Sequence, residues 1–210
     1  MKLSGKCAII TGASCGFGFE VAKAFVTEGA KVMLCARDIA KLNAAKIQLD
    51  KFCNGNAEIF ISHSDVSDKN SVEELVRLAI TKLNSIDILV SNAGIYGPKG
   101  PIEEINWDEW SSAIDINLKG TVLICRSVIP YMKKQKSGKI ILLSGGGATK
   151  PMPNISAYAA SKAAVVRFGE TLAGELESYN IEVNSIAPGA LNTRLMDEIL
   201  NSPPEKVTGS

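Results

Sequence analysis

The sequence is poor in the residues from which metal sites are built. It has a single histidine, His63, and its five cysteines contain no Cys-x-x-Cys pair. A zinc site would be hard to assemble from that set. We therefore expect no metal and assign His63 no role. Because Cys7 and Cys35 sit in apolar runs that are typical of buried strands, we expect free thiols in a reducing compartment.

The sequence also has no excess of charge and no long apolar segment at its start. Its 23 basic and 22 acidic residues give a formal net charge of +1. The one dense basic cluster, at 133–136, is typical of a solvated helix end, so we expect no nucleic-acid partner. The first residues carry too few apolar side chains for a signal peptide or a membrane span. We expect a cytoplasmic protein with no membrane partner.

What is present is the composition of an ordinary globular domain, with 46% hydrophobic and 21% charged residues over a length of 210. A chain of this length is long enough for one sizeable core and short for two. No repeat, low-complexity tract or Pro/Ser-rich linker divides it. We expect residues 1–210 to form a single domain.

Short apolar runs alternate with longer amphipathic segments along the chain. The runs have the length of strands and are apolar throughout, which is typical of a parallel sheet that helices cover on both faces. The pattern predicts a doubly wound α/β fold, Rossmann-like, in three α/β/α layers. The expected strands are Cys7–Thr11, Val32–Ala36, Ile59–Ser62, Ile86–Ser91, Ile140–Ser144 and Glu182–Ala187, and the expected helices are Gly18–Thr27, Ile39–Lys51, Val72–Leu83, Trp107–Lys133 and Ala157–Tyr179.

The first strand runs into a glycine-rich turn, Thr11 to Gly18, which an amphipathic helix follows. This is the context of a phosphate-binding turn: Gly12 permits a sharp turn, Gly16 a close backbone approach, and Gly18 close packing of the helix on the sheet. The helix N-terminus adds unpaired N–H groups. We expect the turn, with Ser14 and Phe17, to bind a dinucleotide. A glycine-rich loop without a ligand is the alternative.

The end of the second strand bears on which dinucleotide is bound. An NAD site is expected to have a carboxylate there, where the sequence has Ala36. The guanidinium of Arg37 follows directly and suits a 2′-phosphate, so we slightly favour NADP(H) over NAD(H). A solvated arginine, with Asp38 as a helix cap, is the alternative.

Two further strand ends carry candidate cofactor contacts. Asp65 and Val66 follow the third strand, where the carboxylate accepts from an adenine amino group and the next N–H contacts the ring. A helix cap is the alternative. Asn92, Ala93 and Gly94 follow the fourth strand, where small residues let a cofactor lie against the backbone and the Asn92 amide ties neighbouring strands together. A plain loop turn is the alternative.

Tyr158 and Lys162 lie four residues apart on a predicted helix and therefore share one face. For a tyrosine to act as acid or base near neutral pH, its pKa must fall from ~10 to about 7, which takes roughly 4 kcal/mol. A lysine cation one turn away is a suitable source. A Tyr-x-x-x-Lys pair on its own is common on surface helices, so the surrounding motifs decide.

The order of these motifs resembles the short-chain dehydrogenase/reductase family along nearly the whole chain. The glycine turn is followed by Asn-Ala-Gly, the helical Asn117, the strand-terminal Ser144, Tyr-x-x-x-Lys and then Pro-Gly. The resemblance implies an NAD(P)-dependent oxidoreductase that acts on a small-molecule alcohol/ketone pair. It also implies a homodimer or homotetramer.

The same resemblance implies roles for particular residues. Tyr158 would be the general acid/base, and Lys162 would lower its pKa and bind the nicotinamide ribose. Ser144 would polarise the substrate oxygen, and Asn117 would hold a water in the proton relay. Contacts to the carboxamide would come from Pro188, Gly189 and Thr193.

The chain departs from the family pattern in two places. The family's serine most often lies 13 residues before the tyrosine, a place that Gly145 occupies here, while Ser144 lies 14 before it. We expect Ser144 to serve, with a shifted loop. Family members also usually continue through another helix and a seventh strand, so we expect a truncated chain that lacks both.

Two other functions remain open. A cofactor-binding regulatory or scaffold module would keep the fold with little turnover, and a nucleotide-sugar epimerase would return its cofactor unchanged. The substrate itself is not predictable from the sequence. Tyr96 and Met152 are candidates for lining its pocket, with packing as the alternative.

Overall fold

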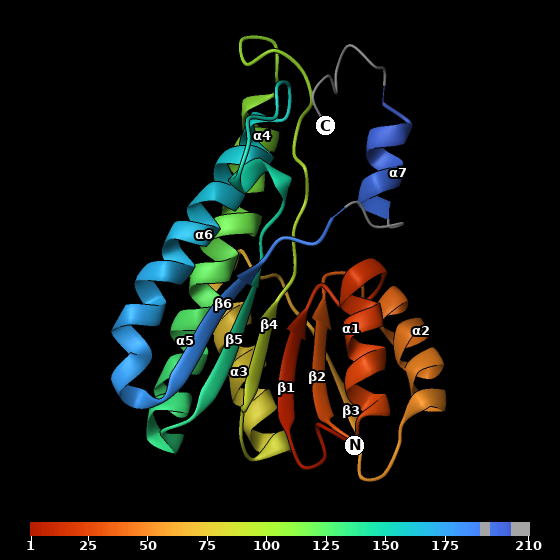
Figure 1. Ribbon diagram of the computed structural model, residues 1–210. Helices are drawn as coiled ribbons and strands as arrows, with labels where there is room; N and C mark the ends of the chain where they lie inside the picture. The colour runs from red at the N-terminus through yellow and green to blue at the C-terminus, as the bar shows by residue number, and fades with distance from the viewer. Residues whose placement is uncertain (190–193, 203–210) are drawn as a thin grey trace.

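The computed structural model describes residues 1–189 and 194–202, and in that part of the chain six parallel strands form one sheet in the order β3-β2-β1-β4-β5-β6 (Figure 1). This is the order of a doubly wound dinucleotide-binding sheet, in which the direction of winding reverses between β1 and β4. The predicted fold class is confirmed. The strands are β1 (Cys7–Thr11), β2 (Lys31–Ala36), β3 (Ile59–His63), β4 (Ile88–Ser91), β5 (Gly138–Leu143) and β6 (Ile181–Ile186).

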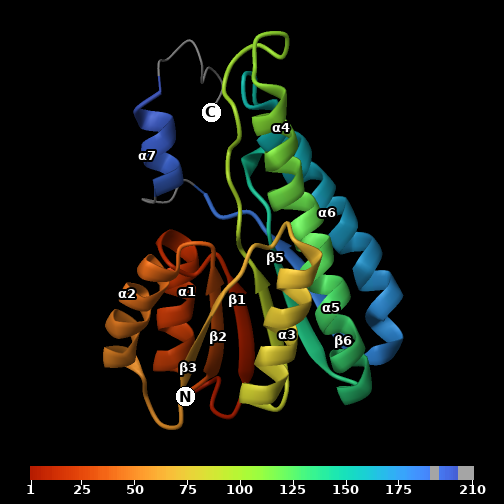
Figure 2. The ribbon, with the colours of Figure 1, turned by 180° about the vertical axis from the view of Figure 1, so that it is seen from behind.

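Helices cover the sheet from both sides, with α1 and α2 on one face and α3, α5 and α6 on the other (Figures 1 and 2). Each face has its own apolar cluster, because consecutive strand residues point to opposite faces: Ile9 packs toward α3 and α5, and Ile10 toward α1. The helices are α1 (Gly16–Thr27), α2 (Ile39–Leu49), α3 (Lys69–Leu83), α4 (Trp107–Ile114), α5 (Gly120–Gln135), α6 (Ser156–Leu176) and α7 (Arg194–Leu200).

One predicted helix is wrong in its continuity. We expected a single helix over Trp107–Lys133, but α4 and α5 are joined by a π-helical turn, Asp115–Lys119. The turn contains the buried Asn117, whose backbone carbonyl accepts a hydrogen bond of 2.8 Å from the Thr121 hydroxyl. Such π turns are frequent at functional sites because they re-aim a side chain within a helix.

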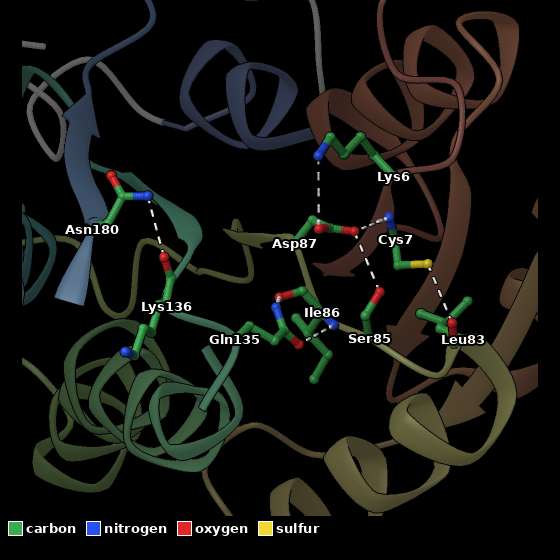
Figure 3. A network of polar contacts seen from close by, with 9 residues as sticks. All are labelled: Lys6, Cys7, Leu83, Ser85, Ile86, Asp87, Gln135, Lys136 and Asn180. Carbon is green, nitrogen blue, oxygen red and sulfur yellow. Dashed lines mark hydrogen bonds and ion pairs between the residues drawn. The ribbon is translucent and has the colours of Figure 1, made fainter. Parts of the chain in front are cut away.

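The amino ends of the central strands are held together by polar contacts (Figure 3). The Asp87 carboxylate accepts a hydrogen bond of 2.8 Å from the backbone N–H of Cys7 and lies 3.9 Å from the Lys6 ammonium. The Gln135 side chain pairs with both the N–H and the C=O of Ile86, at 3.2 and 3.1 Å. Protein groups therefore close this end of the sheet, and the predicted site residues lie at the opposite end.

Candidate active site

The glycine turn, Thr11 to Gly18, joins β1 to α1 at the point where the winding reverses. Gly12 and Gly16 have φ angles of +64° and +59°, a left-handed conformation that favours glycine. The Asn92 side chain donates to the carbonyls of Thr11 and Gly12, at 2.9 and 3.1 Å. As expected, this amide ties β4 to β1.

Thr11 completes the link, because its hydroxyl oxygen accepts from the backbone N–H groups of Asn92 and Ala93, both at 3.0 Å. Thr11 was not among the predicted site residues. The one feature of the sequence that could have indicated this role is the position of Thr11 directly before Gly12. The double connection holds the small residues after β4 directly against the turn.

The turn and the end of β4 approach so closely that side chains have no room between them. A Cβ on Gly12 would lie 2.9 Å from the Ala93 Cα, and one on Gly18 would lie 2.5 Å from the Gly12 carbonyl oxygen. Of the other predicted turn residues, Ser14 is half-buried, while Phe17 packs against the apolar cluster of β1 and β2. The result is an open backbone turn of the kind that fits a pyrophosphate.

Arg37 is exposed just after β2, while the neighbouring Asp38 caps α2 by accepting from the Lys41 N–H at 2.9 Å. Burial would raise the pKa of Asp65, but hydrogen bonds from Ser67 and the nearby charge of Arg37 outweigh it and hold that pKa below its usual value. Arg37 and Asp65 follow two neighbouring strands, β2 and β3, at the same end of the sheet.

The predicted Val66 is buried and its side chain fills the space beside Gly120, where a Cβ would lie 2.9 Å from it. Pro188 and Gly189 follow β6 at the same end of the sheet. Thr193 lies outside the described residues.

Asn117 joins three elements. Its side chain accepts from the Ile95 N–H at 2.8 Å and donates to the Ile95 carbonyl at 2.8 Å and to the Ser161 hydroxyl at 2.9 Å. Gly94 faces both Asn117 and Lys162, because a Cβ there would lie 3.2 Å from Asn117 Oδ1 and 3.5 Å from Lys162 Nζ. The π turn thus brings the predicted asparagine beside the predicted lysine.

Lys162 is buried on α6, and its ammonium donates to the Leu143 carbonyl at 2.7 Å. It lies 5.7 Å from the centre of the Tyr158 ring. Burial lowers the pKa of Lys162 to about 8 and raises the pKa of Tyr158 to about 12. Burial therefore raises the pKa of Tyr158 by more than the charge of Lys162 lowers it. From the sequence we expected the lysine to lower that pKa.

Ser144 is placed differently from our expectation. Its hydroxyl donates to the Lys162 carbonyl at 3.3 Å, and its N–H donates to the Ile186 carbonyl at 2.8 Å. The residue whose Cα faces the Tyr158 hydroxyl is Gly145. A Cβ there would overlap the hydroxyl oxygen and lie only 3.0 Å from Tyr158 Cζ. Consecutive residues of an extended segment point to opposite sides, so the one-residue offset decides which of the two faces the tyrosine.

The ring of Tyr96, in the loop after β4, packs against Tyr158 with centroids 4.6 Å apart and planes 49° apart. Tyr96 also lines a cavity of about 470 Å³ between this loop, the start of α4, and Glu198 of α7. The sequence singled it out only as a possible pocket residue. Met152 lies by Gly147, where a Cβ would be 3.2 Å from its sulfur.

Neither a metal site nor a membrane-spanning helix is seen in the described part of the chain. Over residues 1–189 and 194–202, no three His, Cys, Asp or Glu side chains gather where they could hold a metal ion. Over the same residues, no helix is both long and apolar enough to span a membrane.

The sequence is similar to known proteins over almost all of its length. The sequence model of a family described as short chain dehydrogenase matches residues 6–203. The 3-oxoacyl-(acyl-carrier-protein) reductase of Thermotoga maritima is 35% identical over 207 residues, which cover 98% of this chain and 80% of that protein.

Solved structures share the fold. An NAD⁺-bound xylitol dehydrogenase has a TM-score of 0.86 at 29% identity, over 90% of this chain and 72% of that one. A metagenomic short-chain oxidoreductase in complex with NADP has a TM-score of 0.84 at 31% identity, over 91% of this chain and 85% of that one.

Proposed function

The chain belongs to the short-chain dehydrogenase family, and from that premise we propose which of its residues carry the reaction. It is an NAD(P)-dependent oxidoreductase acting on CH–OH and carbonyl groups of small molecules. The observation that carries the assignment of residues is the meeting of Lys162 and Asn117 at Gly94, with the Lys162 ammonium 5.7 Å from the centre of the Tyr158 ring.

The glycine turn fits a dinucleotide. Gly12 and Gly18 let the turn lie directly against the residues after β4, and α1 begins at Gly16, so the first N–H groups of the helix lie at this turn. Ser14 and Phe17 flank the phosphates, Asp65 and Val66 take the adenine, and Asn92, Ala93 and Gly94 form the floor. Pro188, Gly189 and Thr193 contact the carboxamide.

The bound nicotinamide supplies or accepts the hydride. In the direction of reduction, Tyr158 gives the proton of its hydroxyl to the carbonyl oxygen while the carbonyl carbon gains the hydride, and the product is an alcohol. In oxidation the tyrosinate takes that proton back. Lys162 holds the ribose and, when charged, stabilises the tyrosinate, which offsets the burial that keeps the Tyr158 pKa high.

Two of the predicted catalytic residues act through others. Ser144 holds the Lys162 carbonyl and so positions α6, because its hydroxyl is committed to that bond. Asn117 joins the Ile95 loop to Ser161 of α6 and, beside Gly94, holds the relay water.

The site takes NADPH in preference to NADH. Support comes from the exposed Arg37 at the end of β2, where no carboxylate would bind the ribose hydroxyls. Relatives of both kinds exist, since one similar structure holds NAD⁺ and another NADP. The test is titration of the purified chain with NADPH and NADH, following nicotinamide fluorescence. Tighter NADPH binding that Arg37→Ala abolishes supports the preference, and equal affinities contradict it.

Tyr158→Phe tests the reaction itself. Turnover of a panel of ketones (cyclohexanone, 2,3-butanedione and dihydroxyacetone) should fall at least a hundredfold, with NADPH affinity unchanged, because the variant loses only the proton donor. A regulatory module would show no turnover in the wild type. An epimerase would convert its substrate without net oxidation of NADPH.

The remaining assignments concern the whole protein. We assign residues 1–210 to one domain, in the cytoplasm, as a homodimer or homotetramer. Light scattering of the purified chain measures the subunit number.

A further inference from the structure

The resemblance to the family implies a serine hydroxyl as a second donor to the substrate oxygen, and Gly145 stands at the position where that serine most often lies. Gly145, which faces the tyrosine hydroxyl, has no side chain. Two buried serine hydroxyls already have acceptors: Ser144 donates to the Lys162 carbonyl at 3.3 Å, and Ser161 donates to the Tyr158 carbonyl at 2.8 Å. Any second side-chain donor must come from elsewhere.

Building on the proposed function, we propose that Tyr96 is a second catalytic residue, whose hydroxyl donates a hydrogen bond to the same substrate oxygen as Tyr158. Its ring belongs to the loop after β4 and lies against the Tyr158 ring, with centroids 4.6 Å apart. It also lines the 470 Å³ cavity, so a molecule in that cavity meets Tyr96.

The position of Tyr96 is fixed by its neighbours. Lys99 belongs to the same loop, and its ammonium lies 5.7 Å from the centre of the Tyr96 ring. That ammonium donates to the Glu198 carbonyl at 2.8 Å and to the Ser202 hydroxyl at 3.0 Å, which anchors the loop to α7. A donor held in place before the reaction costs no reorganisation when charge develops on the oxygen.

The chemistry of a phenol suits the role. Burial, with the charge of Glu198, raises the pKa of Tyr96, so its hydroxyl stays protonated at neutral pH and can donate. Tyr96 neither gains nor loses a proton in the reaction: Tyr158 supplies the proton, the nicotinamide supplies the hydride, and Tyr96 stabilises the negative charge that develops on the oxygen between those events.

The role predicts how strongly different ketones depend on Tyr96. Among the panel, 2,3-butanedione presents a second carbonyl next to the reacting one, and cyclohexanone presents only methylene groups. We expect both to depend on Tyr96 equally, since the bond is to the reacting oxygen.

The test is Tyr96→Phe in the full chain, which keeps the ring against Tyr158 and removes only the hydroxyl. We expect kcat for the panel ketone with the fastest wild-type turnover to fall 10²–10³-fold, the usual effect of losing one such donor, with the NADPH dissociation constant unchanged. The exposed Tyr131 on α5 supplies the matched control, and Tyr131→Phe should leave kcat unchanged.

Other outcomes overturn the proposal. If Tyr96→Phe keeps kcat within about threefold of wild type while Tyr96→Leu loses activity, the ring packs against Tyr158 and the hydroxyl has no part in the chemistry. If the wild-type protein turns over ketones and Tyr158→Phe does not, the proposed function holds whatever the result for Tyr96→Phe. Absence of wild-type turnover overturns both.

Discussion

Replacing Gly145 by alanine tests the contact on which the site's geometry depends. The backbone there is extended, with φ of 179°, so any residue can adopt it. The added methyl group would overlap the Tyr158 hydroxyl and lie 3.0 Å from Cζ, inside the 3.4 Å at which ordinary contacts begin. Because Tyr96 packs against the same ring, Tyr158 has to move along the site to make room.

The size of the effect follows from that movement. Relief of the overlap shifts the hydroxyl by about 1 Å, and a misplacement of that size can cost on the order of 10²-fold in rate, or about 3 kcal/mol of activation free energy. We expect kcat with 2,3-butanedione and NADPH to fall by that factor. The NADPH dissociation constant should stay within twofold, since the glycine turn is untouched.

The neighbouring glycine provides a matched control. A Cβ on Gly146 would meet nothing within 4 Å, so Gly146→Ala should leave kcat unchanged. Both variants are compared by steady-state kinetics and by thermal denaturation, which shows whether each is folded. If Gly145→Ala is as active as Gly146→Ala, or more active than wild type, the tyrosine does not occupy this space during the reaction and the reasoning is wrong.

Two further predictions concern stability. Lys162 has a pKa of about 8 when folded and ~10.4 when unfolded, so from pH 8 upward the unfolded chain binds a proton that the folded chain does not. The difference in unfolding free energy between wild type and Lys162→Met, measured by urea titration, should therefore rise by about 2–3 kcal/mol in favour of wild type between pH 7.5 and 10. If that difference does not change with pH, the Lys162 ammonium is not desolvated. Asn92→Ala removes the side-chain donor to the Thr11 and Gly12 carbonyls and should lower the unfolding free energy by about 1–3 kcal/mol. The control Asn43→Ala, at an exposed position, should lower it by less than ~0.5 kcal/mol. Equal losses in the two variants would show that Asn92 does not link the strands.

Most of the fold is predictable from the sequence because the strands are apolar on both faces. The run Cys7–Thr11 matches β1 residue for residue. Three of the other strands differ by one or two residues at one end, and β5 and β6 differ by one or two residues at both ends. The break between α4 and α5 is not predictable in this way. Apolar residues continue at helical spacing through the π turn, and the bonds of Asn117 to Ile95 cross 22 residues of sequence.

The candidate site is likewise predictable from the sequence only in part. The spacing of Tyr158 and Lys162 fixes their common face, and both are buried together on α6. The spacing of Ser144 and Gly145 does not show which of them faces the tyrosine, since that depends on the direction in which the chain leaves β5. Tyr96 has no motif of its own, and only the fold brings its ring to Tyr158.

The link between Asn92 and the glycine turn spans 81 residues, which has a consequence for how the molecule assembles. Closing a loop of that length costs about 4 kcal/mol of chain entropy, so β1, α1 and β2 can form before the contact that completes the turn. We therefore expect the cofactor-binding surface to be completed late in folding. Cofactor at a hundred times its dissociation constant should add about 2.7 kcal/mol to the stability of the native state.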